Sequence, residues 1–331
     1  MNMKQRLTVG LATVVGVSVL GVSAAMAQKD IIVGGKEPGS SFYTYAAAIA
    51  GVISKNTKKT GKVMAVAGAG VWLPMMENKE VDVGLVSHYQ GWLAKTGKKP
   101  FPRSYDVRLV LVGGGINVGM YVRKDSPIKT RKDIRGKRIA FRYSGSPAIH
   151  VYAEAEIANG GLTWKDVKAV PRTSLYAGQR EDVTERRLDV FYASVGSGVT
   201  RELDATVGIR FLGVDTTPSL LKKMRSVYPV VVKPVKAGPP GIRTNMSLVY
   251  LPVYLITHAK VSDERVYEVV KTLWDHNADL RKAHKRLKRW DRGRFADSQA
   301  ILPYHKGAVR FYKEKGVWSP KVAAAQSQLS K

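Results

Sequence analysis

The sequence of 331 residues contains no cysteine, which excludes disulfide bonds and thiolate metal sites. Its six histidines are scattered, and none forms a His-x-x-x-His or His-Glu-x-x-His pair, so no zinc site is expected. A Walker A motif is also missing. The early glycine cluster does not fit Gly-x-Gly-x-x-Gly, because Lys36 or Glu37 stands where the second glycine is needed. We therefore predict neither a cofactor nor a metal.

Catalytic patterns are missing as well. The chain has no Gly-x-Ser-x-Gly elbow with a following acid and base, and no segment combines a nucleophile, a base and an orienting group. The sequence therefore does not predict an enzyme, although an enzyme of unrecognised type stays open as an alternative.

Only one apolar run is long, and it lies at the N-terminus. Lys4 and Arg6 precede an uncharged stretch, residues 7–27, that ends in Ala-Met-Ala. This order is typical of a secretory signal peptide, here residues 1–27 with cleavage before Gln28. The alternative is an uncleaved anchor helix. A cleaved signal predicts a periplasmic protein.

Acidic residues are few, 26 against 54 lysines and arginines, which gives a net charge of +28. The basic residues are spread along the chain, which does not favour a nucleic-acid partner. The densest run, residues 281–290, has the spacing of a solvated helix face on which Leu280, Ala283, Leu287 and Trp290 pack inward. Contact of this run with a membrane surface or a partner protein remains the alternative.

Strand-like and helix-like segments alternate from residue 31 to residue 193. Expected strands at 31–33, 62–67 and 81–86, separated by helices, predict a βαβαβ unit with a parallel sheet. Strands at 107–112 and 116–122 flank three glycines, and a second unit of the same kind follows, with a helix expected over 175–187. The proline-rich segment 229–241 is expected to be a loop or an edge segment, and 247–257 a strand. About 300 residues suit two α/β lobes. We assign residues 28–115 to lobe 1, 116–245 to lobe 2, and 246–331 to a return into lobe 1.

Two α/β lobes joined by paired crossovers are typical of a ligand receptor that closes around its solute. In open α/β sheets, ligands bind at the carboxyl ends of the strands, where helix N-termini favour anions. Those strand ends carry hydroxyls, glycine amides and aromatics, which suit a small polar ligand. The predicted ligand-binding residues are Gly39, Ser40, Ser41, Tyr43, Trp72, Ser87, His88, Arg142, Ser144, Gly145, Ser146 and Ser194.

Several of these residues have a second interpretation. The serines could instead cap the helices that they precede. Tyr43 and Trp72 could be core aromatics, and His88 a surface histidine. Arg142 suits bidentate recognition of a carboxylate, or it could point to solvent.

The same segments resemble a known family, the TAXI-type solute receptors of tripartite ATP-independent periplasmic (TRAP) transporters. Residues 34–44 have the length of the family's Gly-Thr-Gly-Gly-x-Gly-Gly-Thr-Tyr-Tyr-Pro opening. Residues 81–87, Val-Asp-Val-Gly-Leu-Val-Ser, resemble its Ala-Asp-Leu-Ala-Leu-Val-Gln. Further likenesses lie at residues 121–128, 133–139, 188–192 and 302–316, in the family's order.

The resemblance implies a type II periplasmic-binding-protein fold with hinge crossovers and a ligand cleft between the lobes. It implies capture of a small anionic or zwitterionic solute, glutamate-like or another carboxylate, and delivery to the permease subunits of a TRAP transporter. The chain departs from the family at Gly35-Lys36-Glu37, where the family has Thr-Gly-Gly. We expect a monomer. A receptor for an ABC importer and the ligand-binding module of a sensor remain alternatives.

Overall fold

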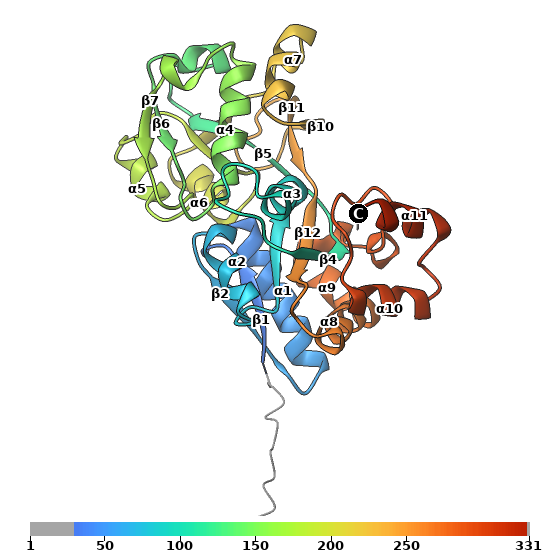
Figure 1. Ribbon diagram of the computed structural model, residues 1–331. Helices are drawn as coiled ribbons and strands as arrows, with labels where there is room; N and C mark the ends of the chain where they lie inside the picture. Colours follow the sequence, from blue (N-terminus) through green and yellow to red (C-terminus); the bar gives the residue numbers. More distant parts are fainter. Residues whose placement is uncertain (1–29, 330–331) are drawn as a thin grey trace, which may run out of the picture.

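The computed structural model describes residues 30–329, so the expected signal peptide lies outside the described residues. Two sheets divide this part of the chain into two lobes, one above the other in Figure 1. The first lobe has the strand order β2-β1-β3-β12-β4. Its strands are β1 (Asp30–Gly35), β2 (Thr60–Ala65), β3 (Val83–Ser87), β4 (Val107–Val112) and β12 (Val253–His258). Strand β1 is parallel to both β2 and β3, which confirms the predicted βαβαβ unit.

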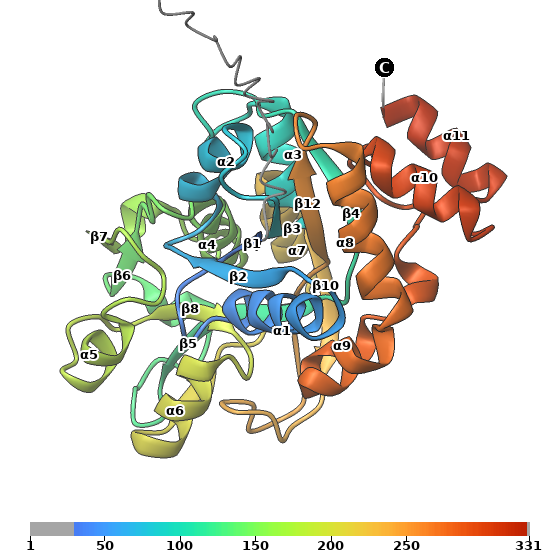
Figure 2. The ribbon, with the colours of Figure 1, turned by 90° about the horizontal axis from the view of Figure 1, so that it is seen from below.

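Helices cover the first sheet on both faces. Helix α1 packs on β1 and β2, and α8 packs on α1 and α10. Figure 2 shows α1 lying along β2, with the C-terminal helices α10 and α11 on the outer side of β4. The helices of this lobe are α1 (Ser41–Asn56), α2 (Ala69–Glu77), α3 (His88–Thr96), α8 (Asp263–Asp275), α9 (Asn277–Ala283), α10 (Lys306–Glu314) and α11 (Pro320–Leu329).

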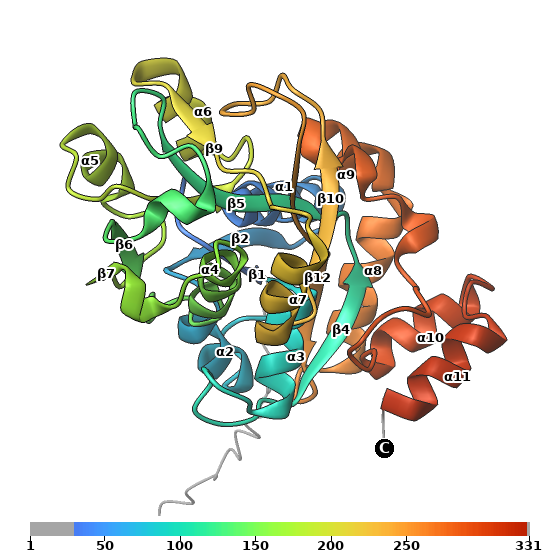
Figure 3. The same cartoon turned by 90° about the horizontal axis from the view of Figure 1, so that it is seen from above.

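The second lobe is also a sheet with helices packed against it, and its strand β5 pairs with three of the other strands. Strand β5 is antiparallel to β8, β9 and β11, while the pair β6–β7 is parallel and joins β8 through a parallel bridge. The strands are β5 (Ile116–Arg123), β6 (Arg138–Phe141), β7 (Lys168–Pro171), β8 (Phe191–Ser194), β9 (Ile209–Phe211), β10 (Val231–Val235) and β11 (Met246–Leu251). Helices α4 (Ala148–Asn159) and α7 (Pro218–Val227) lie against each other, as Figure 3 shows; α5 (Gln179–Thr184) and α6 (Gly198–Thr206) complete the lobe.

The chain crosses between the lobes at two neighbouring points. The first crossover is Gly113–Gly115, between β4 and β5. The second is Pro252, because β11 still pairs with β10 and β5 in the second sheet, whereas β12 pairs with β3 and β4 in the first. The expected single strand over 247–257 is therefore wrong. The return to the first lobe begins at Pro252 rather than at residue 246.

Close packing explains two of the three crossover glycines. A Cβ on Gly113 would lie 2.6 Å from the Trp290 ring, and one on Gly115 would lie 2.2 Å from the Tyr250 ring. Neither residue has a positive φ. These positions need glycine because aromatic rings approach the backbone there, and not because the turn requires a left-handed conformation.

Two other expectations need correction, and one is confirmed. The helix expected over 175–187 is shorter, since α5 begins only after Gly178, whose φ is 74°. The proline-rich segment 229–241, expected as a loop or an edge segment, contains the edge strand β10, in which Pro234 is tolerated. The basic run 281–290 is not one helix: α9 ends at Ala283, which is exposed, and a 3-10 turn follows.

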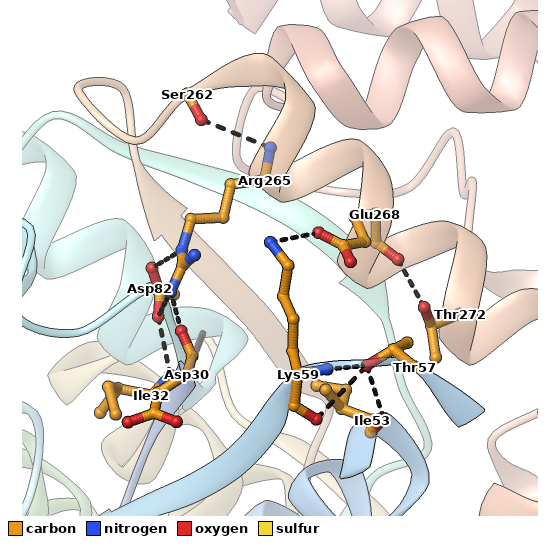
Figure 4. A network of polar contacts seen from close by, with 10 residues as sticks. All are labelled: Asp30, Ile32, Ile53, Thr57, Lys59, Asp82, Ser262, Arg265, Glu268 and Thr272. Carbon is orange, nitrogen blue, oxygen red and sulfur yellow. Dashed lines mark hydrogen bonds and ion pairs between the residues drawn. The ribbon is translucent and has the colours of Figure 1, made fainter. Parts of the chain in front are cut away.

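A buried ion pair joins the elements of the first lobe. The Asp82 carboxylate accepts hydrogen bonds from the Ile32 backbone N–H (2.7 Å) and from Nη2 of Arg265 on α8 (2.9 Å), as Figure 4 shows. Arg265 also donates to the Asp30 carbonyl, and the Thr257 hydroxyl donates to the Asp82 carbonyl (2.6 Å). Asp82 therefore connects β1, the start of β3, β12 and α8. Within residues 30–329, no helix is long and apolar enough to cross a membrane.

Candidate functional site

A small cavity lies between the lobes, at the carboxyl ends of β1, β3 and β8. Such strand ends are where ligands bind in open α/β sheets. The cavity volume is about 30 Å³, enough for about two water molecules. It is lined by Lys36, Ser41, Phe42, Ser87, Gln90, Ile116, Val118, Ile149, Tyr152, Leu175, Tyr176, Tyr192, Ser194 and Leu251.

Two predicted residues meet across the lobes in this cavity. A hydrogen bond joins Ser41 Oγ, at the start of α1, to Ser194 Oγ, at the end of β8 (2.6 Å). Nη1 of Arg286 also donates to Ser41 Oγ, although Arg286 comes from the basic run near the C-terminus. Burial lowers the pKa of Arg286, which nevertheless remains a cation. Ser41 therefore has a positive charge directly behind it.

A second cross-lobe pair lies at the end of β3. A hydrogen bond of 2.5 Å joins Ser87 Oγ to Tyr152 Oη, from α4 of the other lobe. Ser87 also caps α3, since its Oγ accepts a hydrogen bond from the Gln90 N–H (3.4 Å). Capping and cavity lining are thus combined in this residue.

The sequence analysis missed the most unusual residue of the cavity, Lys36. Its side chain is only 4% exposed, and burial lowers its pKa from 10.5 to about 8. Among residues 30–329 no carboxylate lies within ion-pair distance of its ammonium group, which is 5.6 Å from the centroid of the Phe42 ring, although the Glu37 carboxylate offsets part of the effect of burial on its pKa. The neighbouring Glu37 instead accepts a hydrogen bond from Ser174 across the lobes. A buried cation without an ion pair is costly, and the attraction of Glu37 compensates it only in part, so Lys36 points to a negatively charged ligand.

Apolar atoms form most of the rest of the cavity wall, and each of its remaining polar side chains can donate a hydrogen bond. The lining residues include no aspartate or glutamate. Gln90 Nε2 and Tyr192 Oη are buried and have no hydrogen-bond partner in the described part of the chain. Burial raises the pKa values of Tyr152, Tyr176 and Tyr192, so their hydroxyls keep their protons. The arrangement can therefore donate several hydrogen bonds to an acceptor-rich ligand.

Backbone contacts close the lobes at two places beside the cavity. Ser146 Oγ donates to the Ala67 carbonyl (2.7 Å), and a Cβ on Gly145 would lie 2.1 Å from the Ala67 Cβ. On the other side, the Val199 N–H donates to the Gly39 carbonyl (3.1 Å). Gly39, Gly145 and Ser146 thus hold the two lobes together, and the structure is a closed form.

The structure does not bring the remaining predicted residues to the cavity. Ser40 is buried and caps α1, accepting a hydrogen bond from the Tyr43 N–H (2.9 Å). The Tyr43 side chain is half-buried and does not line the cavity. Trp72 is fully buried beneath the first sheet, against Gly34 and Gly84.

His88, Arg142 and Ser144 also lie elsewhere. His88 packs on the Tyr254 ring, and burial lowers its pKa to about 4, so the imidazole is neutral at neutral pH. Arg142 is exposed, with its guanidinium over the Phe141 ring, and Ser144 is exposed. No group of three or more potential metal ligands occurs within residues 30–329.

Sequence signals for the additional cavity residues differ in strength. Lys36 lies in the opening loop at a position where the resembled family has glycine. This difference is visible in the sequence and could have marked Lys36 as a candidate site residue. Tyr152 and Tyr192 lie inside a helix and a strand, and their positions match any core aromatic. Arg286 belongs to a run interpreted as a solvated face, and only the folded chain places it behind Ser41.

Solved structures share this two-lobed architecture. A protein described as a periplasmic transporter aligns with a TM-score of 0.55 at 16% identity, over 93% of this chain and 98% of its own. The periplasmic binding protein BugD gives 0.55 at 13% identity, over 89% and 97%. MatC from Rhodopseudomonas palustris, with bound malate, gives 0.54 at 13% identity, over 90% and 98%. These likenesses confirm the predicted fold class, an α/β fold of the periplasmic-binding-protein type.

Sequence comparison assigns the family independently of these folds. The model of the NMT1-like family matches residues 33–316, which include both sheets, both crossovers and all the cavity residues described above. The chain is therefore a member of the NMT1-like family.

Proposed function

We propose that this protein is an exported solute receptor that captures a small organic acid or amino acid between its lobes. The observation that carries the proposal is Lys36, a buried ammonium that forms no ion pair, in a cavity whose wall contains no carboxylate. A carboxylate placed beside Lys36 would restore the missing charge balance, and charge-assisted hydrogen bonds are about twice as strong as neutral ones. MatC, a structural neighbour, holds malate.

Capture proceeds by opening and closing of the lobes. The closed cavity of about 30 Å³ is too small for any organic acid, so a solute binds only when the lobes separate. When the lobes close around the solute they stop short of the form described above, and Ser41 and Ser87 of the first lobe and Tyr152, Tyr192 and Ser194 of the second surround it. Lys36 takes the carboxylate, and Gln90 and Tyr192 donate their unused hydrogen bonds to its other oxygens.

Delivery to the permease subunits of a TRAP transporter is proposed from the resemblance at residues 34–44 and 81–87. The signal-peptide pattern at residues 1–27 supports export to the periplasm. A receptor for an ABC importer would have the same fold. Uptake that follows a sodium gradient and needs no ATP would support the TRAP assignment, and ATP-dependent uptake would refute it.

The binding test is calorimetric titration of the refolded protein with dicarboxylates, monocarboxylates, amino acids and neutral analogues. We expect one class of acids to bind and the neutral analogues to fail. A ligand at 100 times its Kd should also add about 2.7 kcal/mol to the free energy of unfolding. Absence of binding by any acid, or equal binding of neutral analogues, would overturn the proposal.

A further inference from the structure

A second, larger cavity lies between the lobes, next to the crossovers. Its volume is about 590 Å³, within the range of small-molecule sites. The second lobe contributes Asn117, Gly196, Arg201 and the loop 238–240, and the first lobe contributes Tyr45 and residues 285–289. Ile116 lines both cavities, and Arg286 lies at the boundary, since it donates to Ser41 of the smaller one.

The wall of this basic cavity carries charge of one sign only. Its lining residues include five cations and no aspartate or glutamate; the cations are Arg201, Lys285, Arg286, Lys288 and Arg289. In the part of the chain that the structure describes, none of the five forms an ion pair. Other lysines and arginines of this strongly basic chain are also unpaired, so what distinguishes the cavity is that five of them line one space.

These cations come from both lobes and repel one another in the closed form. Arg201 lies on α6 of the second lobe, and its charge contributes to lowering the pKa of Arg286 and of His284 in the first lobe. Arg201 donates one hydrogen bond, to the Gly196 carbonyl (2.8 Å), which leaves most of its guanidinium donors unused. Closure brings these like charges together, so an anion between them would stabilise the closed form.

We propose that the basic cavity binds a small anion carrying two or more negative charges, and that this anion bridges the lobes and favours their closure. This cavity is distinct from the one around Lys36, so the proposal made for it does not depend on the proposed solute site. Two or more charges are required because the anion must contact cations on both lobes at once. A cavity of this volume accommodates a tricarboxylate or a phosphate, and the shared chemistry is multivalent negative charge.

The test compares two triple variants with matched charge changes. Lys285→Gln/Lys288→Gln/Arg289→Gln removes three cations of the basic cavity and leaves Arg286, which contacts Ser41, in place. The control, Lys222→Gln/Lys223→Gln/Arg225→Gln, removes three exposed cations from α7. Both are made in a Lys36→Met background, so that acid binding at the proposed solute site is weakened by about 10- to 100-fold. Citrate, inorganic phosphate and acetate are titrated by calorimetry at constant ionic strength.

We expect citrate and phosphate to bind to the Lys36→Met protein at one site, and acetate at least about tenfold more weakly, because it has a single charge. The cavity triple variant should lose citrate affinity by about tenfold or more, and the α7 control by less than about twofold. Citrate should also reduce the radius of gyration measured by X-ray scattering. Equal losses in both triple variants, binding that is independent of anion valence, or no binding would overturn the proposal.

Discussion

Replacing Lys36 with methionine should make the ligand-free protein more stable and a poorer receptor. Burial lowers the pKa of Lys36 from 10.5 to about 8. At about 1.4 kcal/mol per pH unit, this difference corresponds to about 3 kcal/mol by which the buried charge destabilises the folded state at pH 7. Methionine has a similar length and no charge, so Lys36→Met should raise the free energy of unfolding by up to this amount.

The sign of the pH dependence follows from the same pKa. Between pH 8 and 10.5 the unfolded chain keeps the Lys36 proton while the folded chain loses it, so this group makes the wild-type protein more stable as pH rises. The stability advantage of Lys36→Met should therefore be complete below pH 8 and shrink toward pH 10. Urea denaturation of both proteins at several pH values measures it, with the exposed Lys58→Met as the control.

Ligand affinity should change in the opposite direction. Loss of a charge-assisted hydrogen bond costs about 1.5–3 kcal/mol, so acid affinity should fall about 10- to 100-fold in Lys36→Met and stay unchanged in Lys58→Met. Wild-type affinity should fall above pH 8, where Lys36 must first regain its proton. A Lys36→Met protein that is less stable than wild type, or that binds the acid equally well, would refute the reasoning.

Three further substitutions test the closed form and the first lobe. Gly145→Ala places a Cβ 2.1 Å from the Ala67 Cβ, so X-ray scattering should show a more open protein with solute affinity reduced at least about tenfold; wild-type affinity would contradict this. Arg142→Ala should leave affinity within about twofold, because the side chain is exposed; calorimetry checks it, and a tenfold loss would contradict it. Asp82→Ala removes the carboxylate that forms the buried ion pair with Arg265 and should cost about 3 kcal/mol in urea denaturation, whereas a loss below about 1 kcal/mol would refute the role assigned to this pair.

Much of the architecture could be predicted because its signals are local. The β-branched run at 31–33 lies in β1, and most of the run at 81–86 and all of 107–112 are strands in the structure. The parallel strands β1 and β3 end at the same edge of one sheet, which is why the pattern groups Ser41 with Ser87, whereas Ser194 joins them from the other sheet.

Other boundaries could not be predicted from local patterns. Residues 247–257 form an apolar run interrupted by Pro252, which argues locally against one strand, but the sequence does not say that the two halves belong to different sheets. The division at Pro252 depends on which strands pair with each half. The basic run 281–290 shows the same limit, since His284 is extended and breaks the expected helix.

The amino-acid pattern alone was sufficient for the two-lobed α/β class, the first βαβαβ unit and the strand-end serines, because hydrophobic period and turn chemistry act within a few residues. Only the tertiary structure decided that Lys36 is buried without an anion and that Arg286 stands behind Ser41, 245 residues away. Whether a charge is buried depends on the remote segments that close over it. Here those segments belong to the opposite lobe and to the C-terminal return of the chain. Local sequence patterns do not predict that they pack against these residues.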